Sequence, residues 1–258
     1  MNRPKVVVCN TASLDGRLTL APDVLLLWGD ERWPGGTESS AAFEWLQFAH
    51  QPQATLEGSG SFVLDGNDPT PLPPFEDEFE RETLYTDFLP PAVVERPAHQ
   101  GWFTVVDGRG RGRQWIKDGG AFGEAWQGWR LLVFVARQTP PAYLAYLRRE
   151  DIPYLVAGDE RVDLSAALEK LREKLDITTV LSTAGGRLNG ALLRASLVDE
   201  VNVELLPAVI GGFDTPSLFD SPALAPGEEP TRLALISVQV GNEGRVWLRY
   251  RVVSEEAR

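Results

Sequence analysis

The stretch from Ile177 to Phe213 constrains the fold more than any other part of the chain. It opens with a short apolar run at 179–181 that predicts a buried strand, and it breaks at Gly185 and Gly186. Leucines at helical spacing follow, and a second predicted strand at 201–205 alternates apolar with polar residues. A strand, a glycine turn, a helix and a strand in this order predict an anion site at the helix start, where backbone N–H groups and the helix dipole favour negative charge.

The rest of the chain repeats this alternation of predicted strands and helices. Strands are predicted at 5–10, 54–57, 102–106, 131–136 and 154–157, and helices at about 37–50, 140–150 and 163–175, the last capped by Asp163. This alternation predicts an α/β fold with a mostly parallel central sheet of about nine strands flanked by helices, in a single domain over residues 1–258. An irregular, proline-rich insertion is expected at about 65–100, and 112–129 stays without an assigned structure.

Two alternating runs at 232–240 and 245–253 close the chain, with Gly241–Gly244 between them as the turn. They predict an antiparallel C-terminal hairpin. The alternation shifts between Leu235 and Ile236, which predicts a β-bulge in the first of these strands.

Composition removes several classes of function. The formal net charge is −12, so nucleic acid is not an expected partner. Cys9 is the only cysteine, which leaves no disulfide within the chain and no cysteine-based zinc site, and no histidine pair has metal-ligand spacing. No apolar run approaches a membrane span and no signal peptide is recognisable, so we expect a soluble, cytoplasmic protein with no metal and no membrane contact.

Three predicted strands end in glycine-rich or small polar loops, at Gly58–Ser61, Asp107–Arg111 and Gly185–Asn189. At one sheet edge, these loops would make an extended anion-binding wall of the kind that a dinucleotide needs, although each loop alone also fits a plain tight turn. Arg109 and Arg111 could clasp a phosphate, or could be a solvated loop tip. Asp15 could orient a polar substrate or shuttle a proton, or could simply belong to an Asp-Gly turn.

Four segments together resemble the pyrimidine reductases of riboflavin biosynthesis, which are the reductase domain of RibD and have a dihydrofolate-reductase-like fold. The segments are VVVCNTASLDGRL, EGSGSFVLDGNDP, FTVVDGRGR and LSTAGGRLNGALLRASLVDEVNVELLPAVIGG. The resemblance implies an NADPH-dependent reductase that acts on the ribose of a phosphoribosylaminopyrimidine. Because no P-C-x-x-C deaminase motif is present, the resemblance implies a stand-alone reductase, and such reductases tend to be homodimers.

Carried over position by position, the resemblance also implies site residues. Cofactor-binding residues would be Ala12, Gly58, Ser61, Asp65, Gly108, Arg109, Gly185, Gly186, Arg187, Leu188 and Asn189. Asp15 would be the catalytic residue, and Ser13 and Thr183 would contact the substrate.

Three positions depart from the family pattern, and all belong to its substrate half. Thr183 replaces a glutamate, FEWLQFAHQPQ lacks the usual arginine, and residues 70–73 lack another. Two alternatives therefore stay open: a reductase of another pteridine- or pyrimidine-like compound, and a non-catalytic NADP-binding protein.

Overall fold

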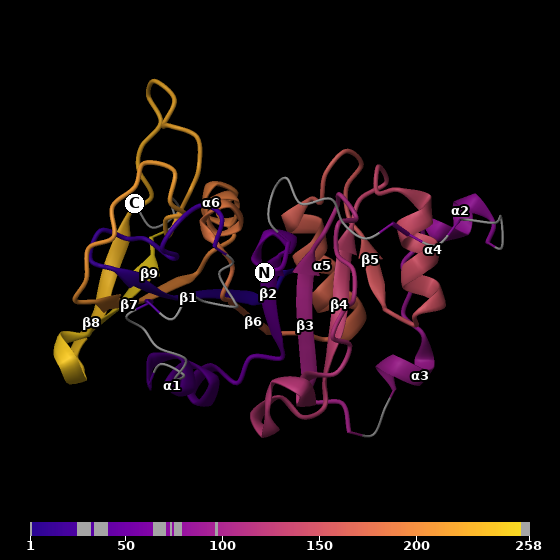
Figure 1. Cartoon of the computed structure of the whole chain (residues 1–258), viewed down its shortest axis with the longest axis horizontal. Coiled ribbons are helices and arrows are strands. Elements are labelled where there is room, and N and C mark those ends of the chain that lie inside the picture. Colours follow the sequence, from indigo (N-terminus) through magenta and orange to yellow (C-terminus); the bar gives the residue numbers. More distant parts are fainter. Residues whose placement is uncertain are drawn as a thin grey trace. The chain divides into compact units, whose positions relative to one another are not determined.

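The computed structural model describes residues 2–24, 32–33, 41–63, 71–72, 74, 79–95 and 98–253, with the backbone alone at 41–43 (Figure 1). These residues form two compact units. The first unit holds Met1–Pro4, Gln53–Ser59 and Gly66–Thr178, as far as they are described. The second unit holds Lys5–Pro52, Gly60–Asp65 and Thr179–Arg258, as far as they are described.

The first unit is built on four parallel strands in the order β5-β4-β3-β2 (Figure 1). They are β2 (Ala54–Gly58), β3 (Gly101–Val106), β4 (Trp129–Val135) and β5 (Tyr154–Val156). Its helices are α2 (Arg81–Leu84), α3 (Pro91–Val94), α4 (Pro141–Arg149) and α5 (Leu164–Leu175). Short 3₁₀ turns occupy Gly119–Phe122 and Glu124–Trp126. Asp163 caps α5 as predicted, because its Oδ1 accepts the Ala166 N–H at 3.1 Å.

The second unit has five strands in the order β6-β1-β7-β9-β8. They are β1 (Lys5–Ser13), β6 (Thr179–Ser182), β7 (Glu200–Leu206), β8 (Leu233–Val240) and β9 (Val246–Val252). β1 runs parallel to both β6 and β7, whereas β9 is antiparallel to β7 and β8. The helices are α1 (Ala41–His50) and α6 (Gly186–Arg194), with a 3₁₀ turn at Asn242–Gly244. A further 3₁₀ turn, Ser59–Ser61, begins at the last residue of Gln53–Ser59 and continues in the second unit.

The predicted fold class is confirmed, since the described residues hold nine strands that pair mostly in parallel, with an antiparallel pair at the C-terminus. The predicted bulge is confirmed by a register shift between Leu235 and Ser237. β1 runs three residues past its predicted end, because its last residues pair with β7 up to Ser13↔Leu206. In the proline-rich insertion, α2 and α3 are single turns, and the predicted caps of α1 at 37–40 lie outside the described residues.

Part of the second unit's core is a cluster around the single thiol. Cys9 is buried together with Val7, Leu46, Leu181 and Trp247. Burial, assisted by the charge of Glu204, raises the pKa of Cys9 to about 12. The thiol is therefore protonated at neutral pH and sheltered from reagents in the folded unit.

β7 buries polar side chains at the alternate positions that its sequence pattern showed. Glu200 is 5% exposed, and its carboxylate accepts hydrogen bonds from Lys5 (3.0 Å), Arg249 (3.0 Å) and Asn202 (3.1 Å). The His50 ring lies 3.3 Å away, and burial lowers the pKa of His50. Burial alone would raise the pKa of Glu200, but the three hydrogen bonds outweigh it and lower the pKa from 4.5 to about 2.

We predict that Glu200→Gln lowers the free energy of unfolding at pH 7 by about 3 kcal/mol, since one pKa unit corresponds to about 1.4 kcal/mol. The contribution of Glu200 is complete above pH 4.5 and is lost as the pH falls toward 2, because the folded state keeps this carboxylate ionised longer than the unfolded chain does. The difference between variant and wild type should therefore shrink through this window, as measured by urea denaturation. The exposed Glu173→Gln is the control, and a pH-independent difference would contradict the prediction.

Candidate functional site

In the first unit, the candidate residues lie on loops that follow neighbouring parallel strands. Gly58 ends β2 opposite Val106 of β3, so the next loops leave the same edge of this sheet. The Arg111 guanidinium donates to the Ser59 hydroxyl at 3.5 Å and joins the two loops. The structure thus brings Gly58 and the predicted loop Asp107–Arg111 together.

A buried carboxylate shapes the loop that carries Arg109. Asp107 is 1% exposed and accepts the backbone N–H groups of Arg111 (3.1 Å) and Gly112 (2.8 Å) and the Tyr143 hydroxyl (2.8 Å). Burial and the Asp107 charge raise the pKa of Tyr143 well above its ordinary value, so the phenol stays a donor. The Asp107 carboxylate thus holds the loop together by hydrogen bonds on its buried side, while Arg109 is exposed at the loop tip.

Gly108 is tied to the end of the next strand. The Thr139 hydroxyl donates to the Gly108 carbonyl at 2.8 Å, and the same oxygen accepts the Ala136 N–H at 2.9 Å. A Cβ on Gly108 would lie 3.2 Å from the Val162 side chain. Gly108, which itself belongs to the proposed cofactor loop, is therefore crowded on the side that faces the protein.

In the second unit, the glycine turn between β6 and α6 rests on a buried amide network. Asn189 is fully buried, and its amide donates to Asn10 Oδ1 (2.9 Å) and to the Ala184 carbonyl (2.7 Å). Ser182 Oγ donates to Asn189 Oδ1 at 2.8 Å, and the Asn10 amide donates to the Ala184 carbonyl at 3.1 Å and more weakly to that of Thr183. Because Asn189 is buried, it would support ligand binding by fixing the conformation of the turn and would not contact the ligand with its side chain.

Gly186 starts α6 and is packed against a later segment of the chain. A Cβ there would overlap the Ser217 carbonyl oxygen and lie 2.7 Å from Asp220 Oδ2. Gly190, one turn on, faces the same segment, since its Cβ would lie 2.6 Å from the Asp220 carbonyl. These two glycines therefore admit a neighbouring stretch of backbone, a requirement that the sequence analysis did not foresee.

The remaining residues of this turn stay open to a ligand in different degrees. Gly185, Leu188 and Thr183 are half-buried, and Arg187 is exposed. The first turn of α6 holds no acidic residue. Small residues, the positive end of a helix and a nearby cation make this turn suitable for a phosphate group.

Asp15 connects the end of β1 to the loop after β7. Its carboxylate accepts from the Ser13 hydroxyl (2.6 Å) and from the N–H groups of Ile210 (3.1 Å) and Gly211 (2.7 Å). The hydrogen bond from Ser13, followed by those from the two backbone groups, holds the pKa of Asp15 well below its ordinary value. Asp15 is therefore suited to accept hydrogen bonds and to orient a partner, and unsuited to donate a proton near neutral pH.

Other predicted site residues are less accessible. Ala12 and Ser13 are fully buried, and Ser61 is 4% exposed in the turn after β2. Asp65 lies outside the described residues. Within the described ranges, no group of three His, Cys, Asp or Glu side chains is placed to hold a metal ion. Likewise, no helix in this part of the chain is long and apolar enough to cross a bilayer.

Sequence reasoning missed Asn10, Ser182, Thr139 and Tyr143. Asn10 carried a usable signal, since it is a lone amide at the end of an otherwise apolar strand. Thr139 and Tyr143 carried none, because their partners are backbone groups or lie far away in the chain. Ser182 bonds Asn189 only seven residues on, but a serine that ends a predicted strand is too common to single out.

Comparison with known proteins places the chain in a family. A sequence model of the RibD C-terminal domain matches residues 4–246. The 2,5-diamino-6-ribosylamino-4(3H)-pyrimidinone 5′-phosphate reductase of Methanothermobacter thermautotrophicus is 35% identical over 104 residues, which are 40% of this chain and 47% of that protein. The protein of the same name from Archaeoglobus fulgidus is 36% identical over 91 residues, 35% and 41% of the two chains. The matched part spans less than half the length of either relative.

Solved structures share the fold. RibD of Acinetobacter baumannii superposes with a TM-score of 0.60 at 18% identity, over 98% of this chain and 59% of that one. A pyrimidine reductase-like protein from Corynebacterium diphtheriae gives a TM-score of 0.65 at 16% identity, over 98% and 94% of the two chains. The expected dihydrofolate-reductase-like architecture is thus confirmed. Because the family model covers nearly its whole length, the chain belongs to the RibD C-terminal domain family.

Proposed function

We propose that the chain is an NADPH-dependent reductase that transfers a hydride to the ribose C1 of a phosphoribosylaminopyrimidine in riboflavin biosynthesis, resembling 5-amino-6-(5-phosphoribosylamino)uracil reductase. The observation that carries this proposal is the turn between β6 and α6, which Asn10 and Asn189 hold in place and which lies within the residues that the family model matches. The names of the relatives, reductases of a ribosylaminopyrimidine 5′-phosphate, agree with it.

The resemblance divides the cofactor between loops that suit its parts. Gly185, Gly186 and Arg187 would meet the pyrophosphate, since they open a helix without acidic residues in its first turn. Arg109 or Arg111 would meet the 2′-phosphate from a loop that Asp107 fixes internally. Ala12, Gly58, Ser61, Asp65, Gly108, Leu188 and Asn189 complete the proposed set, the buried members acting through the backbone or by supporting the loops.

The protein's own residues would position the ribose for reduction. When bound, the reduced nicotinamide supplies a hydride to C1, and a proton is taken up as the C1–O bond opens. Asp15 stays ionised, so it would accept a hydrogen bond and orient the substrate while another group or water donates that proton. The Ser13 hydroxyl is engaged with Asp15, and Thr183 would offer a half-buried hydroxyl to the substrate.

Thr183 and the missing arginines favour one alternative within the same class, a reductase of another pteridine- or pyrimidine-like compound. The α1 segment, Ala41–His50, contains no arginine that could meet a substrate phosphate. A non-catalytic NADP-binding protein is the second alternative.

Purified protein should oxidise NADPH only when the phosphoribosylaminopyrimidine is added. Asp15→Asn should slow this turnover and leave NADPH affinity unchanged, because the carboxylate is proposed to meet the substrate. NADPH binding without turnover would reject this substrate and keep the cofactor, whereas turnover with a pteridine would establish the alternative. A protein that fails to bind NADPH would reject the whole proposal.

We also propose a cytoplasmic homodimer. β8 is the edge strand of the second unit's sheet and is lined by exposed apolar side chains. They are Leu233, Leu235, Ile236, Val238 and Val240, with exposed fractions of 43–80%. Such an edge is normally covered in a soluble assembly. Sedimentation should show two copies for the wild type and one for Val238→Lys; a monomeric wild type would reject the dimer.

A further inference from the structure

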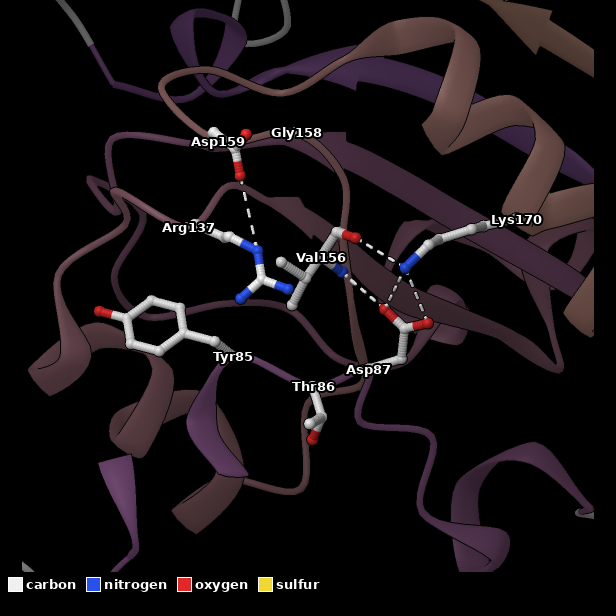
Figure 2. Close-up of a pocket in the computed structure, with 8 residues that line it drawn as sticks. All are labelled: Tyr85, Thr86, Asp87, Arg137, Val156, Gly158, Asp159 and Lys170. Atoms are coloured by element: carbon white, nitrogen blue, oxygen red, sulfur yellow. Dashed lines mark hydrogen bonds and ion pairs between the residues drawn. The ribbon is translucent and has the colours of Figure 1, made fainter. Parts of the chain in front are cut away.

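A pocket of about 400 Å³ opens at the carboxyl ends of β4 and β5, within the first unit (Figure 2). It is lined by residues 85–87, Arg137, Val156, Gly158, Asp159 and Lys170. Val156 ends β5, and Arg137 follows β4 by two residues. The carboxyl ends of parallel strands are where ligands bind in open α/β sheets.

The charged side chains of this pocket differ in how tightly they are paired. Lys170 bonds both oxygens of Asp87 (2.8 and 2.9 Å) and the Val156 carbonyl (2.7 Å), and Lys174 adds a second cation 3.2 Å from Asp87. The Asp87 carboxylate is thus neutralised by two ammonium groups. In a chain of net charge −12, this is a local site where an anion is not repelled.

Arg137 is the cation that can exchange its partner. Figure 2 shows its guanidinium in the middle of the labelled side chains, facing Asp159. That ion pair is 3.5 Å long, and its side chains are 64% and 86% exposed. An exposed pair of this kind is weak, so a phosphate, which takes two parallel N–H bonds from arginine, can displace Asp159.

Backbone hydrogen bonds hold the floor beneath Arg137 and connect it to the proposed cofactor loop. The Arg137 N–H donates to the Gly158 carbonyl at 3.1 Å, and the Gln138 N–H donates to the Asp159 carbonyl at 2.9 Å. Two residues on, the Thr139 hydroxyl donates to the Gly108 carbonyl at 2.8 Å. The loop with Arg137 and the loop with Arg109 are therefore locked side by side.

We propose that Arg137 joins Arg109 or Arg111 in binding the 2′-phosphate of NADPH, a ribose phosphate monoester that enters this pocket, and that Arg137 and Asp159 together set the preference for NADPH over NADH. This inference rests on the proposed function, because it takes NADPH as the cofactor. Arg137 binds the phosphate, and Asp159 competes with the phosphate for Arg137.

The two members of the ion pair should therefore have opposite effects. Titration calorimetry of the full chain should show NADPH binding about tenfold weaker in Arg137→Gln, with NADH binding unchanged. Asp159→Asn should bind NADPH about threefold more tightly, since it removes the competing charge and keeps the backbone hydrogen bonds. Arg161→Gln, an exposed arginine of the same loop outside the pocket, should bind both cofactors as the wild type does.

Other results would overturn the proposal. Weaker binding in both variants, or equal losses for NADPH and NADH, would mean that the ion pair only holds the loop. Unchanged NADPH binding in Arg137→Gln would remove this residue from the site. Ribose 5-phosphate binding that is lost in Arg137→Gln, with NADPH binding intact, would assign the pocket to the substrate's phosphate.

A second probe separates this inference from the proposed function. Binding of 2′,5′-ADP that depends on Arg137, without reduction of any pyrimidine, would keep the pocket and reject the reductase. If the protein binds neither 2′,5′-ADP nor NADPH, both the pocket assignment and the proposed reductase function are rejected.

Discussion

Gly186→Ala is expected to lower the free energy of unfolding by about 3 kcal/mol, the upper range for forcing atoms into a packed site. Helix propensity alone predicts the opposite sign, because alanine is better than glycine in a helix by about 1 kcal/mol. Steric overlap wins, since the new methyl would meet the Ser217 carbonyl, which belongs to backbone and cannot rotate away. Urea denaturation of both proteins would measure the difference.

The matched control is Gly241→Ala. A Cβ on Gly241 has its nearest neighbour at 3.6 Å, an ordinary contact, and the residue is exposed at the hairpin turn. Its effect should stay within about 0.5 kcal/mol, as for other surface substitutions. Gain of stability in Gly186→Ala would show that the 217–220 segment does not pack on this helix. Loss of NADPH binding in that variant, without loss of stability, would instead point to direct cofactor contact.

Asn189→Asp should destabilise the fold by about 3–5 kcal/mol at pH 7, the usual loss for a buried charge without a partner. The new carboxylate would face Asn10 Oδ1 and the Ala184 carbonyl, two acceptors that now receive the Asn189 amide protons. Repulsion among three acceptors would open the turn before α6. NADPH affinity should fall with it, because the proposed pyrophosphate site is that turn.

The pH dependence of this variant identifies the cause. Burial beside acceptors favours the protonated acid, so the folded-state pKa of the new carboxyl should lie above that of the unfolded chain. Its destabilising effect should therefore be full at high pH and should fade as the pH drops, because the neutral acid can donate one hydrogen bond. Asn242→Asp, at an exposed turn position, is the control and should change little at any pH. A loss in Asn189→Asp that does not vary with pH would argue against a buried charge.

Regular elements were predictable where a local pattern determines them. The leucines of α5 repeat at helical spacing behind Asp163, and the bulge in β8 shows as a shift in alternation between neighbouring residues. Each of these signals lies within a window of about a dozen residues, so no knowledge of distant contacts is needed.

The parts of the site that could not be predicted depend on residues far apart in the chain. Asn189 meets Asn10 across 179 positions, and Tyr143 meets Asp107 across 36. Gly186 has its glycine requirement imposed by Ser217, which lies in a segment without periodicity. Arg137 follows a strand with no motif around it, and its pocket forms only where residues 85–87, the Gly158–Asp159 loop and Lys170 meet it in the fold. Such pairings follow from tertiary packing, which leaves no trace in local sequence.

The buried thiol of Cys9 gives the second unit a chemical probe of its opening, because the thiol can be alkylated only when the unit opens. It is the only cysteine in the sequence, and its neighbours Leu46, Leu181 and Trp247 come from α1, β6 and β9. An alkylating reagent can reach it only when these elements separate, so the labelling rate counts openings of that unit. The first unit holds no thiol, and it is silent in the same experiment. The labelling rate would thus report whether a ligand that binds to the first unit also reduces how often the second unit opens.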